Sequence, residues 1–130
     1  MENKDKILMA DGSIINRIHF LQDLKVGDEL IGYTSYWGKS DQYVVDSIGR
    51  KYATLKRGSN EYKMSLNDGI FHYKDLNQFN ITFFKTQEEL SAYLNNLKCK
   101  KEVRDILRKL DVSFLDIEKV VKLKSLLEEL

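Results

Sequence analysis

Residues 26–58 read VGDELIGYTSYWGKSDQYVVDSIGRKYATLKRG, and this stretch decides the fold class. β-Branched and aromatic residues fill its short runs and turn residues separate them, as in several short antiparallel strands. The pattern extends to about residues 14–85, and Asn67-Asp68-Gly69 supplies the clearest turn because Asn and Gly tolerate positive φ. We therefore expect a small antiparallel sheet or barrel with meander-like spacing. The expected strands are residues 28–35, 41–48, 52–56, 62–66, 69–73 and 79–85.

The N-terminal residues leave alternatives open. Within residues 16–24, the apolar residues Ile18, Phe20, Leu21 and Leu24 fit either a helical turn or an entry strand. Residues 9–13, which read MADGS, form a candidate hairpin turn. That turn predicts a first strand at residues 6–10 and its partner at 13–18.

The apolar spacing changes after Lys85 to a helical period. Thr86-Gln87-Glu88-Glu89 matches a capping box, in which the Thr hydroxyl accepts the backbone N–H three residues on and the Glu side chain returns to the cap. Apolar residues recur at helical spacing in 90–97 and again in 103–110, which predicts two helices or one bent helix. Residues 111–113 are an expected connector to a last helix. The apolar stripe of that helix is narrow enough for a helix partner and comprises Leu115, Val120, Leu123, Leu127 and Leu130.

The whole chain is therefore expected to be an α+β protein. An N-terminal antiparallel β-sheet or small barrel, at about residues 14–85, precedes two to three C-terminal helices in residues 86–130. The 130 residues and 15.2 kDa fit a single domain. Its 42% apolar and 32% charged residues exclude a disordered chain. The lone Cys99 indicates a reducing compartment. No membrane span or secretory signal is visible, and the net charge of +1 disfavours a duplex-binding protein, so nucleic acid is not the first partner expected.

Catalytic and cofactor-binding patterns are absent from the sequence. His19, His72 and Cys99 lie far apart and match no metal-ligand spacing, so each histidine is more simply a structural residue. Neither glycine-rich phosphate-loop pattern occurs. Adjacent carboxylates such as Glu88 and Glu89 point apart and make no acid–base pair. We therefore expect no enzyme, no cofactor and no metal. A catalytic site assembled from distant residues ranks last among the alternatives.

Positive side chains offer an anion site. Arg104 and Arg108 lie four residues apart on a predicted helix, so both guanidinium groups share one face and can grip phosphates. The alternative is that each arginine pairs with an acid, for example Arg108 with Asp105 or Asp111. Lys56 and Arg57 end a predicted strand before Gly58, and they are either a second phosphate contact or solvated turn charges.

Aromatic side chains offer a platform on which a base can stack. Phe83 and Phe84 are neighbours on a predicted strand, so one faces the core and the other faces out. Tyr33, Tyr36 and Trp37 cluster near Gly38 in an expected loop, where they either meet a partner or anchor the core.

The layout resembles a group of small phage proteins. It shares a V-G-D strand entry at 26–28, a G-R-K-Y strand start at 49–52, the threonine-led helix at 86–89 and short C-terminal helices in 102–130. Within that group it is similar to the phage anti-Thoeris sponges, which sequester cyclic ADP-ribose signals made by bacterial TIR-domain defence proteins without cleaving them. The resemblance implies a homo-oligomer with ligand pockets at subunit junctions, in the cytoplasm of the host bacterium. It also implies that Arg104 and Arg108 hold phosphates, Phe83 or Phe84 stacks on adenine, Arg57 adds a phosphate contact and Gln87 reaches the base or ribose.

The leading hypothesis is therefore an immune-evasion sponge that binds a cyclic nucleotide signal. The alternative is a small-barrel module for nucleic-acid or protein interaction, with Tyr36, Trp37, Lys56 and Arg57 on its binding surface. Strong salt dependence of polynucleotide binding favours the module, whereas binding restricted to a small cyclic nucleotide favours the sponge.

Overall fold

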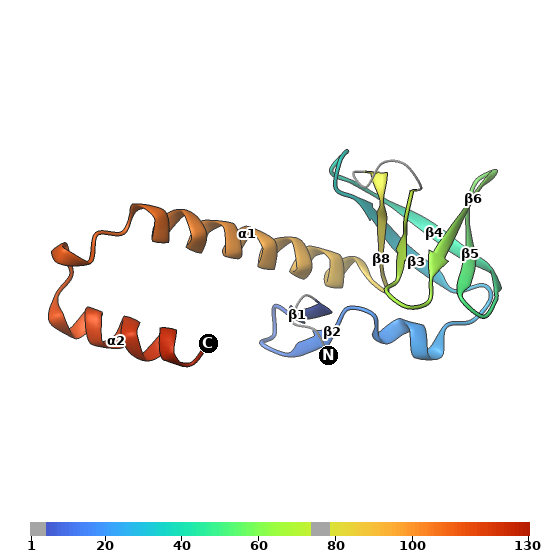
Figure 1. The fold of residues 1–130 in the computed structure, drawn as a ribbon. Coiled ribbons are helices and arrows are strands. Elements are labelled where there is room, and N and C mark those ends of the chain that lie inside the picture. The colour runs from blue at the N-terminus through green and yellow to red at the C-terminus, as the bar shows by residue number, and fades with distance from the viewer. Residues whose placement is uncertain (1–4, 74–78) are drawn as a thin grey trace. The chain divides into compact units, whose positions relative to one another are not determined.

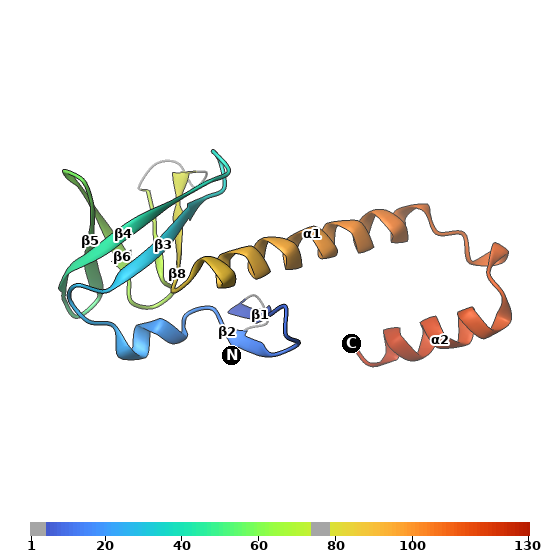
Figure 2. The same ribbon diagram turned by 180° about the vertical axis from the view of Figure 1, so that it is seen from behind.

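The computed structural model describes residues 5–73 and 79–130 (Figures 1 and 2). The chain divides into two compact units, Met1–Asn96 and Leu97–Leu130. The long helix α1 (Gln87–Lys109) contributes residues to both units. No helix among the described residues is long and apolar enough to cross a membrane.

A six-stranded antiparallel sheet forms most of the first unit (Figure 1). The expected antiparallel sheet is confirmed, and each expected strand has a counterpart. The strand order is β6-β5-β4-β3-β8-β7. The strands are β3 (Glu29–Thr34), β4 (Lys39–Ile48), β5 (Tyr52–Arg57), β6 (Asn60–Ser65), β7 (Ile70–Phe71) and β8 (Ile81–Phe84).

The sheet departs from a simple meander after β6. Strands β3 to β6 pair in chain order, but β8 returns to the free edge of β3, where Gly32 pairs with Phe83. Strand β7 then lies beyond β8 and also contacts β6, so the sheet curls into a nearly closed barrel. Closure covers edge groups that an open sheet leaves unpaired.

Gly32 on β3 is required because core side chains approach the backbone closely there. A Cβ atom at this position would lie 2.5 Å from a ring carbon of Tyr43 and 2.9 Å from one of Phe83. Real Cβ contacts are essentially never shorter than 3.0 Å. The glycine therefore lets two core rings approach the β3 backbone.

Phe83 and Phe84 lie on opposite faces of β8, and both faces are covered. Phe83 packs inside the barrel with Leu30, Val45 and Leu55. Phe84 packs in a second apolar cluster with Ile7 and Leu90. Both phenylalanines are 0% exposed. The expectation that one of them faces outward is therefore wrong, because β1 and α1 cover the second face.

The N-terminal residues form the expected hairpin. Strands β1 (Lys6–Leu8) and β2 (Ile14–Asn16) pair antiparallel, with Ile7 opposite Ile15. A 3₁₀ helix follows at His19–Asp23. Residues 16–24 therefore form a helical turn and not an entry strand. Its buried Phe20 joins the barrel core.

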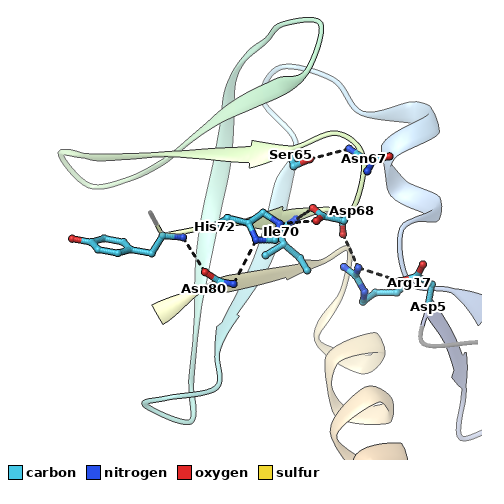
Figure 3. A network of polar contacts seen from close by, with 9 residues as sticks. Asp5, Arg17, Ser65, Asn67, Asp68, Ile70, His72 and Asn80 are labelled. Atoms are coloured by element: carbon cyan, nitrogen blue, oxygen red, sulfur yellow. Dashed lines mark hydrogen bonds and ion pairs between the residues drawn. The ribbon is translucent and has the colours of Figure 1, made fainter. Parts of the chain in front are cut away.

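Arg17 ties this N-terminal segment to the barrel (Figure 3). Its guanidinium group is almost fully buried and donates to the backbone oxygen of Asp68 at 2.6 Å and to that of Phe83 at 3.4 Å. The same group lies 3.4 Å from the carboxylate of Asp5. A buried charge is costly unless it is paired and hydrogen-bonded, and these three contacts meet that need.

The capping box at the start of α1 is confirmed. The backbone N–H of Glu89 donates to the Thr86 hydroxyl at 3.2 Å, and that hydroxyl donates to the buried Glu89 carboxylate at 3.1 Å. The other carboxylate oxygen lies 2.7 Å from Nε2 of His19. Further along the helix, the Asn96 side chain makes two hydrogen bonds to the backbone of Leu8. These contacts fix the first part of α1 to the barrel unit.

The second unit contains the rest of α1, a 3₁₀ turn at Val112–Phe114 and the helix α2 (Ile117–Glu128). The two apolar segments expected at 90–97 and 103–110 lie on one continuous helix that ends at Lys109, rather than on two helices. Asp111 caps the 3₁₀ turn by accepting from the N–H and hydroxyl of Ser113, at 3.0 and 2.6 Å. The expected connector at 111–113 is thereby confirmed.

Candidate functional site

A row of aromatic rings runs from the barrel core to the surface. The Tyr43 ring lies 5.1 Å from Phe83 and 5.4 Å from Tyr62, measured between ring centroids. The row continues outward through Tyr62–Phe71, Phe71–Tyr73, Tyr73–Phe79 and Phe79–Trp37, with centroid distances from 5.3 to 6.1 Å. Most of these pairs meet edge to face, the arrangement that ring quadrupoles favour.

The outer rings line an open pocket of about 610 Å³. This volume lies within the range of roughly 300–1,000 Å³ typical of small-molecule sites. Trp37 and Tyr73 are about half exposed, at 60% and 48%, whereas Tyr43 is buried. Tyr62 and Phe71 lie between these extremes. The pocket thus has an aromatic wall that is accessible to solvent and a floor that belongs to the core.

Strand geometry brings charged residues to the same pocket. Lys39, Asp41 and Tyr43 alternate along β4, and side chains two residues apart point to one face of a strand. The inward face of β4 is therefore apolar along the middle of the strand and polar near its N-terminal end. Arg57 ends the neighbouring strand β5 and lines the pocket as well.

One ion pair lies within the pocket. Nη2 of Arg57 is 3.3 Å from Oδ1 of Asp41, and both side chains are partly exposed. Lys39 adds a second positive charge, so two cations and one carboxylate line the pocket among the residues that the structure describes. Burial raises the pKa of Tyr43 above its usual 10.0 and the Tyr62 hydroxyl adds to this, whereas the Arg57 charge acts in the opposite direction. The Tyr43 hydroxyl is therefore protonated at neutral pH.

A family model supplies the relationship of this chain to known proteins. The model describes a phage ProQ C-terminal-like domain and matches residues 1–129. The chain belongs to this family. No curated protein and no solved structure matches it. The family supports the expected phage origin, while membership of the anti-Thoeris sponges is not supported by this match.

The phage ProQ C-terminal-like chain places the expected ligand residues in three different settings. Arg57 lies in the aromatic pocket. Phe83 and Phe84 are fully buried, so neither presents a ring face to a ligand in this structure. Gln87 is exposed at the first position of α1. The structure thus brings Arg57 together with aromatic residues, but not with either phenylalanine of β8.

Arg104 and Arg108 are exposed on the part of α1 that belongs to the second unit. Their helical spacing of four residues is as expected, so the two guanidinium groups share a face. Within residues 5–73 and 79–130, neither arginine forms an ion pair with the acids considered as partners, Asp105 and Asp111. An anion clamp at this pair remains a prediction.

The residues of the alternative binding surface divide between two sides of the barrel. Trp37 and Arg57 line the pocket, and the Tyr36 ring packs 4.8 Å from Trp37. Lys56 instead lies 3.6 Å from Asp46 and 3.6 Å from Glu61. Tyr33 packs with the cluster around Phe84. Successive residues of a strand face opposite ways, so Arg57 enters the pocket while Lys56 does not.

Sequence reasoning missed several pocket residues, namely Lys39, Asp41, Tyr62, Tyr73 and Phe79. The alternation of Lys39, Asp41 and Tyr43 was a visible signal for one wall. The other wall comes from β6, β7 and the start of β8, and it joins the first wall only because the sheet closes on itself.

Both histidines contact a carboxylate. Nε2 of His72 lies 2.6 Å from Asp68, whose other carboxylate oxygen accepts from the backbone N–H of Ile70 at 3.0 Å (Figure 3). Asn80 accepts from the N–H of Tyr73 at 2.9 Å. His19 contacts Glu89 as described above. Among the described residues, no group of three or more His, Cys, Asp or Glu side chains is placed to hold a metal ion.

Proposed function

We propose that this phage ProQ C-terminal-like domain is a non-enzymatic binding module that takes up a nucleotide unit in the aromatic pocket. The observation that carries the proposal is one open cavity of about 610 Å³ whose described lining combines exposed aromatic rings with two cations and one carboxylate. A nucleotide combines a flat aromatic base with a negative phosphate, and the pocket offers a complement to each.

The base is expected to stack on the outer rings. Trp37 and Tyr73 expose about half of their surface, and Phe79 lies between them with its centroid 5.9 Å from Trp37 and 6.0 Å from Tyr73. Ring packing restrains all three side chains, so little rotamer freedom is lost when a base binds. Stacking of one base on an aromatic side chain contributes about 1–3 kcal/mol.

The phosphate is expected to meet Lys39 and Arg57. The guanidinium group carries five N–H donors in a planar fork, and contact with Asp41 leaves donors free for a phosphate oxygen. Asp41 is then placed to accept from a base amino group or a ribose hydroxyl. The two cations in the described lining also disfavour a cationic ligand, such as a quaternary ammonium group, which aromatic pockets otherwise accept.

Two kinds of ligand would present the same base and phosphate to the pocket. One is single-stranded nucleic acid, as in the small-barrel interaction module, and the open mouth of the pocket favours it because a strand must be able to enter and leave. The other is a free cyclic nucleotide such as cyclic ADP-ribose, as in the sponge. Both are bound without cleavage.

The test uses Trp37, which is the one tryptophan of the chain and lies in the pocket. The full chain is titrated with single-stranded RNA and DNA, with a duplex of the same sequence and with cyclic ADP-ribose isomers, while tryptophan fluorescence is recorded. Bound material is then released by heat and identified by mass spectrometry. Calorimetry on the same samples measures affinity independently of the fluorophore.

Each result has a defined meaning. Fluorescence quenching by single strands, with affinity falling as salt rises, supports the interaction module. Quenching by cyclic ADP-ribose that is recovered intact supports the sponge. Recovery of a cleaved ligand contradicts the non-enzymatic proposal, and the absence of binding by every nucleotide refutes the proposal as a whole.

A further inference from the structure

The turn at residues 35–38 joins β3 to β4 and carries two aromatic residues, Tyr36 and Trp37 (Figure 1). Both side chains are more than half exposed, at 54% and 60%. The backbone of the turn is ordered, because the N–H of Gly38 donates to the oxygen of Thr34 at 2.9 Å and Gly38 takes a φ of +63°. Large apolar side chains that gather on a surface in this way are typical of a binding site. Trp37 lines the aromatic pocket, whereas Tyr36 does not.

The Tyr36 ring stands nearly perpendicular to the Trp37 ring. Their centroids are 4.8 Å apart and their planes differ by 86°. Tyr36 also meets Phe79 edge to face, with a centroid distance of 4.9 Å, whereas the planes of Trp37 and Phe79 differ by only 33°. The three rings therefore brace one another in orientations that ring quadrupoles favour. The barrel thus presents two differently oriented aromatic rings, one in the pocket and one beside it.

We infer that the site takes two consecutive nucleotides of a single strand, with one base stacked on Trp37 in the pocket and the next on Tyr36 beside it. This inference rests on the nucleotide proposed for the pocket and narrows its source to single-stranded nucleic acid. A base lies parallel to the ring on which it stacks, so the two bases have planes nearly at right angles. They are therefore splayed apart, as are the unstacked bases of single-stranded RNA that proteins bind on aromatic side chains.

The right angle between Tyr36 and Trp37 selects against other nucleotide ligands. Neighbouring base pairs lie parallel in a duplex, so two of its bases can cover both rings only after pairing and stacking are lost. That cost is lowest for a strand that is already single. Cyclic ADP-ribose carries one adenine, so it can cover one of the two rings and gains no stacking from the other.

Lys39 is placed to contact the phosphate between the two nucleotides. It follows Trp37 by two residues at the start of β4 and lines the pocket. Arg57 is held beside Asp41, which lies two residues further along the same face of β4. A backbone that passes from Tyr36 into the pocket therefore meets Lys39 before Arg57. The order of the cations matches that of the phosphates on either side of the pocketed nucleotide.

The experiment measures the contribution of the second base at constant ligand charge. The full chain is titrated by calorimetry with a 5′-phosphorylated ribodinucleotide and with the same dinucleotide carrying one abasic position, which keeps both phosphates. We expect the intact dinucleotide to bind about 5- to 150-fold more tightly, the gain that one further stacked base provides. The mononucleotide, cyclic ADP-ribose, a longer single strand and the duplex of that strand are titrated in parallel. The longer single strand should bind more tightly than its duplex.

The variants test whether Tyr36 supplies the second stacking surface. Tyr36→Leu keeps apolar bulk against Trp37 and Phe79 but removes the ring, so it should lower the affinity for the dinucleotide to that of the abasic ligand. The loss should be larger for the dinucleotide than for the mononucleotide. Tyr36→Phe retains the ring and should retain the affinity for the dinucleotide. Tyr52→Leu is the matched control, because Tyr52 is 52% exposed on β5 and does not line the pocket.

Failure of the two-base site can be told apart from failure of the pocket. Equal affinity for the intact and abasic dinucleotides overturns the two-base site alone, as does a duplex that binds as tightly as its single strand. Equal losses of mononucleotide and dinucleotide binding in Tyr36→Leu also overturn it, because Tyr36 then acts only by packing against Trp37. Absence of binding by every ligand refutes the proposed function together with this inference.

Discussion

Arg57 and Asp41 face each other across neighbouring strands, with Nη2 and Oδ1 3.3 Å apart, inside the aromatic pocket of the barrel. The Asp41 carboxylate, on β4, orients the planar guanidinium group of Arg57, on β5, and limits its movement. An arginine held in this way loses less freedom on meeting a phosphate than a solvated one does.

Replacement of Arg57 should weaken nucleotide binding. We expect Arg57→Gln to lower affinity by about 10-fold and to reduce the salt dependence by about one phosphate contact, because a charge-assisted hydrogen bond contributes roughly 1.5–3 kcal/mol. Calorimetric titration at several salt concentrations measures both effects. Lys56→Gln removes a neighbouring charge that is paired outside the pocket, with Asp46 and Glu61. Equal losses in the two variants would contradict a specific role for Arg57.

Removal of an exposed ring should weaken binding without disturbing the fold. Tyr73→Ala is expected to reduce affinity by about 5- to 150-fold, the range that corresponds to the loss of 1–3 kcal/mol of stacking. Tyr52→Ala is the control, because Tyr52 is as exposed as Tyr73 but does not line the pocket. Quenching of Trp37 fluorescence measures affinity in both variants. If Tyr52→Ala proves the more damaging, the base does not bind in this pocket.

A side chain at position 32 should strain the barrel. Gly32→Ala is expected to destabilise the fold by about 1–3 kcal/mol, since its Cβ must displace the rings of Tyr43 and Phe83 in a packed core. Urea unfolding followed by Trp37 fluorescence measures this loss. Gly49→Ala should be milder, because its Cβ approaches a single backbone atom, the Tyr52 oxygen, at 3.1 Å. Unfolding midpoints in the reverse order would show that close packing at β3 is not limiting.

The turn between α1 and α2 should loosen in acid. Hydrogen bonds from the Ser113 hydroxyl and N–H hold the pKa of Asp111 below its usual 3.8. A lowered native pKa means that this contribution to stability is fully present above pH 3.8 and is lost as the pH falls through the lowered value. An NMR titration should give a midpoint below 3.8, which Ser113→Ala moves upward.

The N-terminal hairpin provides an internal reference for that titration. Ser13 makes the same two hydrogen bonds to Asp11, and these lower the pKa of Asp11 as well. Ser113→Ala should leave the Asp11 midpoint unchanged. A parallel shift at both aspartates would mean that the substitution acts through the whole fold rather than through the local hydrogen bond.

Local signals in the sequence were sufficient for most of the secondary structure. Turn glycines separated the strands, and helical spacing began after Lys85, where Thr86 and Glu89 form the expected cap. For residues 16–24 the pattern left both helix and strand open, because the four apolar residues in this segment fit both periods. The 3₁₀ helix formed there because Phe20 enters the barrel core.

The site depended much more on tertiary structure. Arg57 and Trp37 were candidates from their positions near strand ends, but their joint pocket needs Tyr62, Tyr73 and Phe79, which come from later segments. Phe83 and Phe84 were expected to include one exposed ring, since neighbours on a strand point opposite ways. Both are buried because the outer face of β8 is covered by Ile7 and Leu90, from β1 and α1.

The sequence by itself determined the order and kind of the elements, since turn propensity, capping and hydrophobic period act between residues close in the chain. The tertiary structure alone decided which edge β8 joins, which face of each strand is covered, and hence that Arg57 and Asp41 meet beneath a wall of aromatic rings. Those outcomes depend on contacts between residues far apart in the chain, and these form only when the sheet curls until β7 reaches β6.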